Sequence, residues 1–237
     1  RPDQPLNGAL VTVSVLDLML WTKAERARFA AHVRMRLSEM YAALNQRFPV
    51  YVLVTKMDLL AGFTGFFGDY DQTARMQVWG TTFDHDIDPA LIAAPYAKDF
   101  AALEQRLGAE MLARLHEEPD LQRRAAIYRF PQQFHAIGPM LGELLALAFG
   151  TQINHRSAQL RGVYFTSATQ EGNPIDRVLA AMTQTFRLER DKAALTGGTG
   201  KSFFLTRLLR EVVFPEQGLA EVEQAPSAPP EESVQPA

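Results

Sequence analysis

The sequence predicts an α/β fold in which helices cover a parallel β-sheet and a mainly helical segment is inserted. Residues 50–54 form an unbroken apolar run, VYVLV, which is typical of a central parallel strand buried on both faces. A strand-like segment over 8–17 and a helical pattern over 22–45 precede this run, and together the three form a right-handed crossover unit. The helical periodicity of residues 88–149 predicts the insert.

The composition excludes several classes of protein. With 237 residues, of which 47% are hydrophobic and 22% charged, the chain can bury a substantial core. Its net charge of −3 gives no basic surplus for nucleic acid or anionic membranes, and no apolar run reaches the ~18 residues of a bilayer span. The lack of cysteine excludes disulfides and thiolate metal sites and favours a reducing compartment. Because the chain starts at Arg1 rather than Met, we expect a fragment of a longer protein.

The beginning of the chain carries signals for a strand, a helix and a second strand. Valines alternate with small hydroxyl residues over 8–17, as in a strand. Thr22 and Glu25 have the spacing of a capping box, which predicts the start of a helix. The apolar stripe of this helix has six members: Phe29, Val33, Leu37, Met40, Tyr41 and Leu44. We expect the helix to end near Asn45 and the central strand to open at Pro49.

A glycine-punctuated aromatic loop follows the central strand at 59–70. Its three phenylalanines and one tyrosine form either a lid over the core or an exposed docking patch for a partner. We favour the lid, because large exposed apolar patches are uncommon on monomers. A short extended piece is expected at 78–83.

The rest of the chain is predicted to contain helices, one more strand and a polar tail. Two apolar stripes within 88–149 are interpreted as the core faces of helices. A short apolar strand is expected at 162–169, then a helix opened by Asn173-Pro174, then a glycine-rich turn and a helix starting at Ser202. The resulting division is an α/β core at 1–69 and 156–190, a mainly helical insert at 70–155, a glycine turn and helix at 191–221, and a disordered tail at 222–237.

Two short motifs follow predicted buried strands and suit the recognition of a guanine base. Thr55, Lys56 and Asp58 form a T-K-x-D sequence after the central strand, and Ser167 and Ala168 follow the next predicted strand. The Asp58 carboxylate can accept hydrogen bonds from the N1–H and exocyclic amino group of guanine, and the Lys56 stem can lie along the base. The backbone N–H of Ala168 can donate to guanine O6. Because the carboxyl ends of parallel strands hold ligands at one edge, we expect the two tips to lie side by side.

These motifs resemble those of small GTPases, but the phosphate-binding half of such a site is missing. No P-loop pattern, G-x-x-x-x-G-K-[ST], lies before Val11, and no Asp-x-x-Gly sequence occurs to hold a magnesium-bound water. We therefore expect an incomplete P-loop NTPase-like, small-GTPase-like sheet. By itself it should bind nucleotide poorly and hydrolyse none, so no catalytic residue is assigned.

Two other motifs have a chemical and a plain structural interpretation. Residues 197–202, GGTGKS, could cradle a phosphate, but Leu195 stands where the P-loop needs glycine; the alternative is a flexible turn with Ser202 capping a helix. Residues 84–88, DHDID, resemble the start of a calcium loop, but Pro89 and Pro95 replace the required glycine and glutamate. We favour a solvated loop there and predict no metal site.

Nearly the whole chain resembles the cytoplasmic domain of the IcmF/TssM family, inner-membrane subunits of type VI secretion systems. The matching stretches are RPDQPLNG at 1–8, VTVSV at 11–15, RFPVYVLVTKMDLLAGF at 47–63, QVWG at 77–80, FTSATQEG at 165–172 and FFLTRLLREVVFPEQGL at 203–219. The resemblance implies a membrane-anchored parent protein with a P-loop NTPase-like domain on the cytoplasmic face of the bacterial inner membrane. Its P-loop would lie upstream of Arg1, and the DotU/TssL subunit would be its partner.

The resemblance leaves two functions open. The first is an assembly role, in which the helical insert and the aromatic loop contact other secretion components. The second is a switch, in which GTP or ATP with magnesium binds the full-length protein through Lys56, Asp58 and Ala168 and moves the loop at 62–70. We favour the assembly role for this chain, which alone is expected to hold no cofactor. The family continues to a membrane span after Gly218, whereas this chain has a polar tail.

Overall fold

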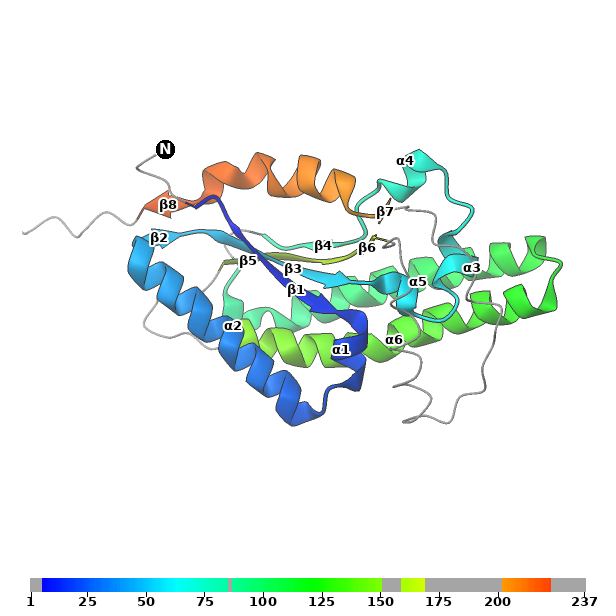
Figure 1. Ribbon diagram of the computed structural model, residues 1–237, viewed down its shortest axis with the longest axis horizontal. Coiled ribbons are helices and arrows are strands. Elements are labelled where there is room, and N and C mark those ends of the chain that lie inside the picture. Colours follow the sequence, from blue (N-terminus) through cyan, green and yellow to red (C-terminus); the bar gives the residue numbers. More distant parts are fainter. Residues whose placement is uncertain (1–5, 85–86, 151–158, 169–201, 223–237) are drawn as a thin grey trace, which may run out of the picture.

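The computed structural model shows a four-stranded sheet with helices on one face and the C-terminal segment on the other (Figure 1). It describes residues 6–84, 87–150, 159–168 and 202–222. The strands lie in the order β1 (Ala9–Ser14), β3 (Pro49–Thr55), β5 (Gln159–Phe165) and β4 (Gly80–Thr82). Two short ladders flank this sheet: β2 (Gln46–Arg47) with β8 (Glu221–Val222), and β6 (Ser167–Ala168) with β7 (Ser202–Phe203).

The central strand is the one that the apolar run at 50–54 predicts. β3 pairs in parallel with β1 on one side and with β5 on the other, and its residues from Pro49 to Val54 are buried. The expectation of a wholly parallel sheet is wrong, because β4 runs antiparallel to β5. The chain reaches β4 from the carboxyl end of β3 through only short helices. It therefore enters the sheet from that edge and has to run in the opposite direction.

The helices vary widely in length. The longer ones are α2 (Lys23–Leu44), α5 (Ala93–Glu117) and α6 (Leu121–Phe149), and the shorter ones are α1 (Val15–Leu20), α3 (Phe63–Phe67) and α4 (Gln72–Arg75). Three 3₁₀-helices are described: η1 (Met57–Leu59), η2 (Pro89–Leu91) and η5 (Pro215–Leu219). The element η4 (Leu208–Val213) is a π-helix. The predicted strand over 8–17 therefore ends earlier, at Ser14, where the apolar spacing changes to that of α1.

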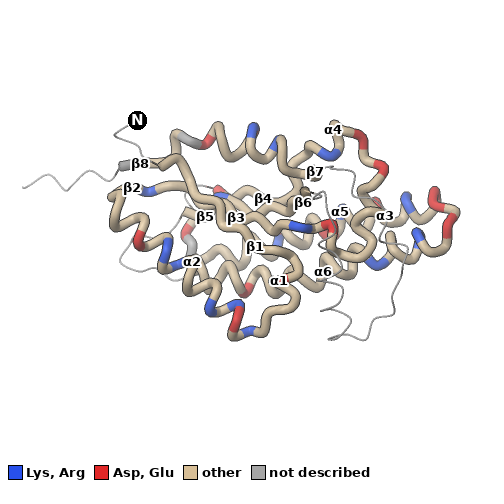
Figure 2. The backbone as a smooth tube through the Cα atoms, in the orientation of Figure 1, with Lys and Arg blue, Asp and Glu red and all other residues tan. Residues whose placement is uncertain are grey.

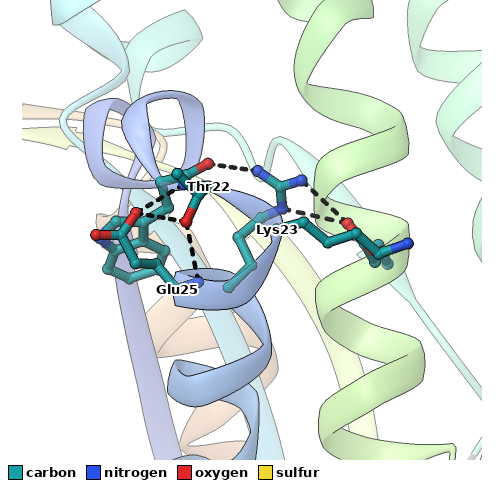
Figure 3. Close-up of polar contacts among 6 residues, drawn as sticks. Thr22, Lys23 and Glu25 are labelled. Carbon is teal, nitrogen blue, oxygen red and sulfur yellow. Dashed lines mark hydrogen bonds and ion pairs between the residues drawn. The ribbon is translucent and has the colours of Figure 1, made fainter.

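The start of α2 confirms the capping box. Thr22 accepts a hydrogen bond from the Glu25 N–H at 3.3 Å, and the Glu25 carboxylate accepts one from the Thr22 N–H at 2.8 Å (Figure 3). The same end of α2 is tied to α6, because Arg26 and Lys23 form ion pairs with Glu143 at 3.1 and 3.3 Å. The helix ends with Asn45 in the left-handed conformation, where the sequence predicts its end.

The aromatic loop after the central strand is a lid over the core, as predicted. Phe63, Phe66 and Phe67 of α3 are almost completely buried. The Phe67 ring lies 5.3 Å from those of Trp79 and Phe130, measured between ring centroids. Aromatic pairs of this kind, of which that with Phe130 is edge-to-face, add to the stabilisation that burial itself provides. The loop that follows the T-K-x-D motif is therefore fixed against β4 and α6.

The segment predicted as an insert belongs to the same core as the sheet. It supplies α4, α5 and α6, as its helical pattern predicts, and also the edge strand β4. Apolar side chains of α5 and α6 join those of β1, β3, β5 and α2 in one continuous cluster. Beyond the core, α5 and α6 form a long hairpin that projects past the sheet (Figure 1).

The C-terminal segment differs from its prediction. Ser202 does not cap a helix but lies in β7, and the π-helix η4 begins at Leu208. Phe203 and Phe204 explain the difference, since both rings are buried in the aromatic cluster and keep residues 202–203 in a strand. Val222, predicted as the first residue of the tail, pairs with Gln46 in the β2–β8 ladder. The helix predicted from Asn173, the residues 197–201 and the remaining tail lie outside the described residues.

We predict that Gly62→Ala lowers the free energy of unfolding by more than about 2 kcal/mol. Gly62 has φ +86°, a conformation that costs other residues about 1–2 kcal/mol, and an added Cβ would lie 2.0 Å from the Ala126 carbonyl oxygen. Urea denaturation measures the change. Gly108→Ala is the control, because its Cβ would meet nothing within 4 Å and Ala is favoured in a helix by roughly 0.5–1 kcal/mol. Equal effects of the two variants would contradict the prediction.

Candidate functional site

The carboxyl ends of β3 and β5 bring the two predicted motifs together. The Met57 N–H donates to the Thr166 carbonyl oxygen at 3.2 Å, and the Thr166 N–H donates to the Val54 carbonyl oxygen at 2.8 Å. The backbones of the two tips are therefore bonded to each other beyond the regular ladder. This confirms the expectation that neighbouring parallel strands place the tips side by side.

Asp58 and Ser167 are in direct contact between the two tips. The Ser167 hydroxyl donates a short hydrogen bond to the Asp58 carboxylate. Ser167 is 1% exposed, and Met57, next to Asp58, is completely buried. The hydrogen bond from this buried donor orients the carboxylate. Since a carboxylate has about four acceptor positions, Asp58 keeps the capacity to accept further bonds.

The other three predicted residues surround this pair. Lys56 is exposed and adopts the left-handed conformation, with φ 60°, which is uncommon for a residue other than glycine and marks the sharp turn after β3. The Thr55 hydroxyl donates to the Val13 carbonyl oxygen at 3.3 Å, so it ties this turn to β1. Ala168 is exposed and pairs with Ser202 in the β6–β7 ladder. The C-terminal segment thus reaches the candidate site.

A second polar cluster, which the sequence analysis missed, lies on the face of the sheet away from α2. Arg161 of β5 binds the Glu216 carboxylate through both Nε and Nη2, at 3.0 and 2.5 Å, and also donates to the Phe83 carbonyl oxygen. The Tyr51 hydroxyl donates to Glu216 at 2.7 Å. Arg161, a charged residue within the mostly apolar run LRGVYF at 160–165, is the signal that could have revealed this cluster.

The partners in this cluster shift one another's pKa. Burial alone would raise the pKa of Glu216, but the hydrogen bonds from Arg161 and Tyr51 and the charge of Arg161 lower it overall. Burial and the bond to Glu216 raise the pKa of Tyr51, and burial raises that of Tyr164 to about 12. Glu216 is thus ionised and both tyrosines are neutral near pH 7, so the cluster is a charge-assisted structural contact.

Within the stretches that the structure describes, no group of three or more His, Asp or Glu side chains could hold a metal ion. The calcium-like motif at 84–88 is only partly described, because residues 85–86 lie outside those stretches. None of the described helices is both long and apolar enough to cross a bilayer.

We predict a favourable coupling of about 1 kcal/mol between Ser167 and Asp58 in a double-mutant cycle with Ser167→Ala and Asp58→Ala. Ser167→Ala alone should lower the free energy of unfolding by about 1–2 kcal/mol, because a partly buried carboxylate loses its donor. Urea denaturation of the four proteins gives the values. Ser38→Ala, at an exposed position of α2, should change stability by less than about 0.5 kcal/mol. Additive effects of the two site variants would show that the contact contributes nothing.

Comparison with known proteins identifies the same family that the sequence motifs resemble. Residues 1–230 match the family described as the IcmF-related N-terminal domain. The chain is 46% identical over 222 residues to the protein named type VI secretion system component TssM1 from Pseudomonas aeruginosa. That match covers 92% of this chain but 20% of the relative, so the chain spans about a fifth of the relative's length. No solved structure gives a significant match.

The similarity thus covers both strand-end motifs, the aromatic loop and the C-terminal segment described above. The family match extends over almost the full chain, and the relative with 46% identity carries the name of a subunit of the same kind. This chain belongs to the IcmF/TssM family of type VI secretion system subunits.

Proposed function

We propose that this chain is a scaffold domain of the type VI secretion membrane complex, placed on the cytoplasmic face of the inner membrane. Its partner there is the DotU/TssL-type subunit. The observation that carries the proposal is the projecting α5–α6 hairpin in a chain that belongs to the IcmF/TssM family. A scaffold needs a rigid body and a surface that remains available, and the hairpin supplies both.

The far part of the hairpin has the composition of a protein interface. Three large apolar side chains are exposed there: Leu112, Leu121 and Tyr128, at 67%, 77% and 53%. Both acidic and basic residues surround this end of the hairpin (Figure 2). Apolar and aromatic anchors within a charged rim are typical of transient protein–protein contacts. We propose this surface as the DotU/TssL contact.

We predict that the double variant Leu112→Glu and Leu121→Glu weakens binding of the purified DotU/TssL-type subunit by at least about tenfold, as expected when interface anchors are lost. Biolayer interferometry with the immobilised subunit measures the dissociation constant. Met35→Glu is the control, because Met35 is 47% exposed on α2, a helix that lies away from the far end of the hairpin (Figure 1). Unchanged binding by the double variant would overturn the assignment of this surface. Equal weakening by Met35→Glu would show that added negative charge, and not lost apolar contact, is responsible.

A second candidate function is nucleotide binding by the parent protein, and the contact between Asp58 and Ser167 favours it. The oriented Asp58 carboxylate lies beside Lys56 and Ala168, which are both exposed. This arrangement suits a guanine base, and it suits adenine with lower specificity. We propose that a P-loop from the rest of the parent protein completes this site for GTP or ATP with magnesium. The position of β1 supports this. β1 is an edge strand that pairs with β3 on one side, no described strand pairs with its other side, and its residue Leu10 is 47% exposed.

We predict that Asp58→Asn in the full-length cytoplasmic region weakens GTP binding at least tenfold and gains binding of xanthosine triphosphate. The amide offers a donor in place of one acceptor, and xanthine carries a carbonyl where guanine carries its amino group. Isothermal titration with GTP, ATP and xanthosine triphosphate measures these affinities. Asp69→Asn, at an exposed position of the loop that follows α3, should leave them unchanged. Absence of heat with every nucleotide would exclude this second function and leave the scaffold role standing.

A further inference from the structure

The C-terminal segment crosses the sheet from one end to the other. We call residues 202–222 the strap. It begins at β7, which pairs with β6 beside the candidate base site, and ends at β8, which pairs with β2 at the opposite end of the sheet (Figure 1). The strap runs opposite to β5: β7 pairs with β6, just after the end of β5, and Glu216 bonds Arg161 near the start of β5.

The first anchor of the strap lies at the site end. Ser202 and Phe203 pair with Ala168 and Ser167, and the Phe204 N–H donates to the Arg75 carbonyl oxygen at 2.6 Å. The Phe203 ring lies 5.4 Å from that of Phe63, and the Phe204 ring 5.2 Å from that of Trp79. The backbone on which Ser167 sits is therefore held from one side by β3 and from the other by the strap.

The second anchor is the ion pair between Arg161 and Glu216. Both side chains are largely buried, at 11% and 19% exposed, and Tyr51 donates a further bond to the carboxylate. Removing one member of a buried pair leaves the other charge without compensation, which costs far more than losing a surface pair. This anchor thus contributes to holding the far end of the strap.

Between the anchors the strap contacts the sheet through one small apolar cluster that is separate from the main core. Its fully buried member from the strap is Leu208, which packs with Tyr51, Leu53 and Tyr164, and three partly buried strap residues join it: Leu205, Val212 and Val213. The backbone is a π-helix, a form that is rare in proteins, and Phe204 has the left-handed conformation, with φ 62°. Segments with little buried apolar area open at a lower free energy than the core.

We propose that the strap docks and detaches as one unit and that its docking sets the position of the Asp58–Ser167 contact. Each anchor keeps the other at high effective concentration, because a single short segment and a single strand connect them. Loss of the Arg161–Glu216 anchor therefore lowers the occupancy of the β6–β7 ladder, about one strand length away. Once β7 leaves, the described contacts that still hold this tip are those with β3 and η1. The strap is a conformational device that relays displacement at its far end to the candidate site.

Amide hydrogen exchange of the 237-residue chain, followed by NMR without nucleotide, tests this coupling. Glu216→Gln should accelerate exchange about tenfold, the size expected for a lost charged hydrogen bond, at Phe204 and Leu209 of the strap. It should also accelerate exchange at the Met57 and Thr166 amides, which join the two tips. Amides within α2, on the other face of the sheet, should keep their rates. Glu39→Gln, which removes the exposed pair with Arg36, should change neither group.

Faster exchange in the strap with unchanged rates at Met57 and Thr166 would overturn the coupling, as would unchanged rates in both places. Tyr51→Phe removes one hydrogen bond to Glu216 without unpairing a charge, and should give a smaller effect at the same four amides. This variant keeps the test available if Glu216→Gln does not fold. Because no nucleotide or partner is present, the result is independent of both functions proposed above.

Discussion

The parallel pairing of β3 with β5 is the constraint on which the rest of this structure depends. It buries β3 on both faces and ends both strands at the same edge, so that Asp58 and Ser167 meet although 109 positions separate them in the chain. A strand that is apolar on both sides requires a cover on each face of the sheet. The helices cover one face of the sheet, and the strap covers the other.

The two covers differ greatly in the apolar surface that they bury. The helical side joins β1, β3, β5, α2, α5 and α6 in one large cluster, whereas the strap side contributes four buried residues. Burial of apolar area is the main source of stability, so the helical side is the permanent part of the fold. The strap depends in addition on contacts near its ends: the Phe203 and Phe204 rings in the aromatic cluster, the β6–β7 and β2–β8 ladders, and the pair of Arg161 with Glu216.

The aromatic cluster connects the parts that have proposed functions. Phe67, in the loop that follows the T-K-x-D motif, contacts Trp79 of the β4 segment, Phe130 of the hairpin and Phe204 of the strap. The candidate base site and the proposed partner surface are therefore attached to one rigid body, and the docked strap packs on that body through Phe204. In a secretion subunit such a body can transmit the position of one contact to another without its own core rearranging.

The sequence by itself determined the local features of this protein. The VYVLV run, the Thr22–Glu25 capping box and the long amphipathic helices depend on neighbours a few positions apart, and all have the predicted structure. The tertiary structure decided what depends on distant partners: the antiparallel direction of β4, the extended conformation at Ser202, and the pairing of Arg161 with Glu216. At Ser202, packing of the two neighbouring phenylalanine rings outweighs a local capping signal, because burial contributes more free energy than one cap.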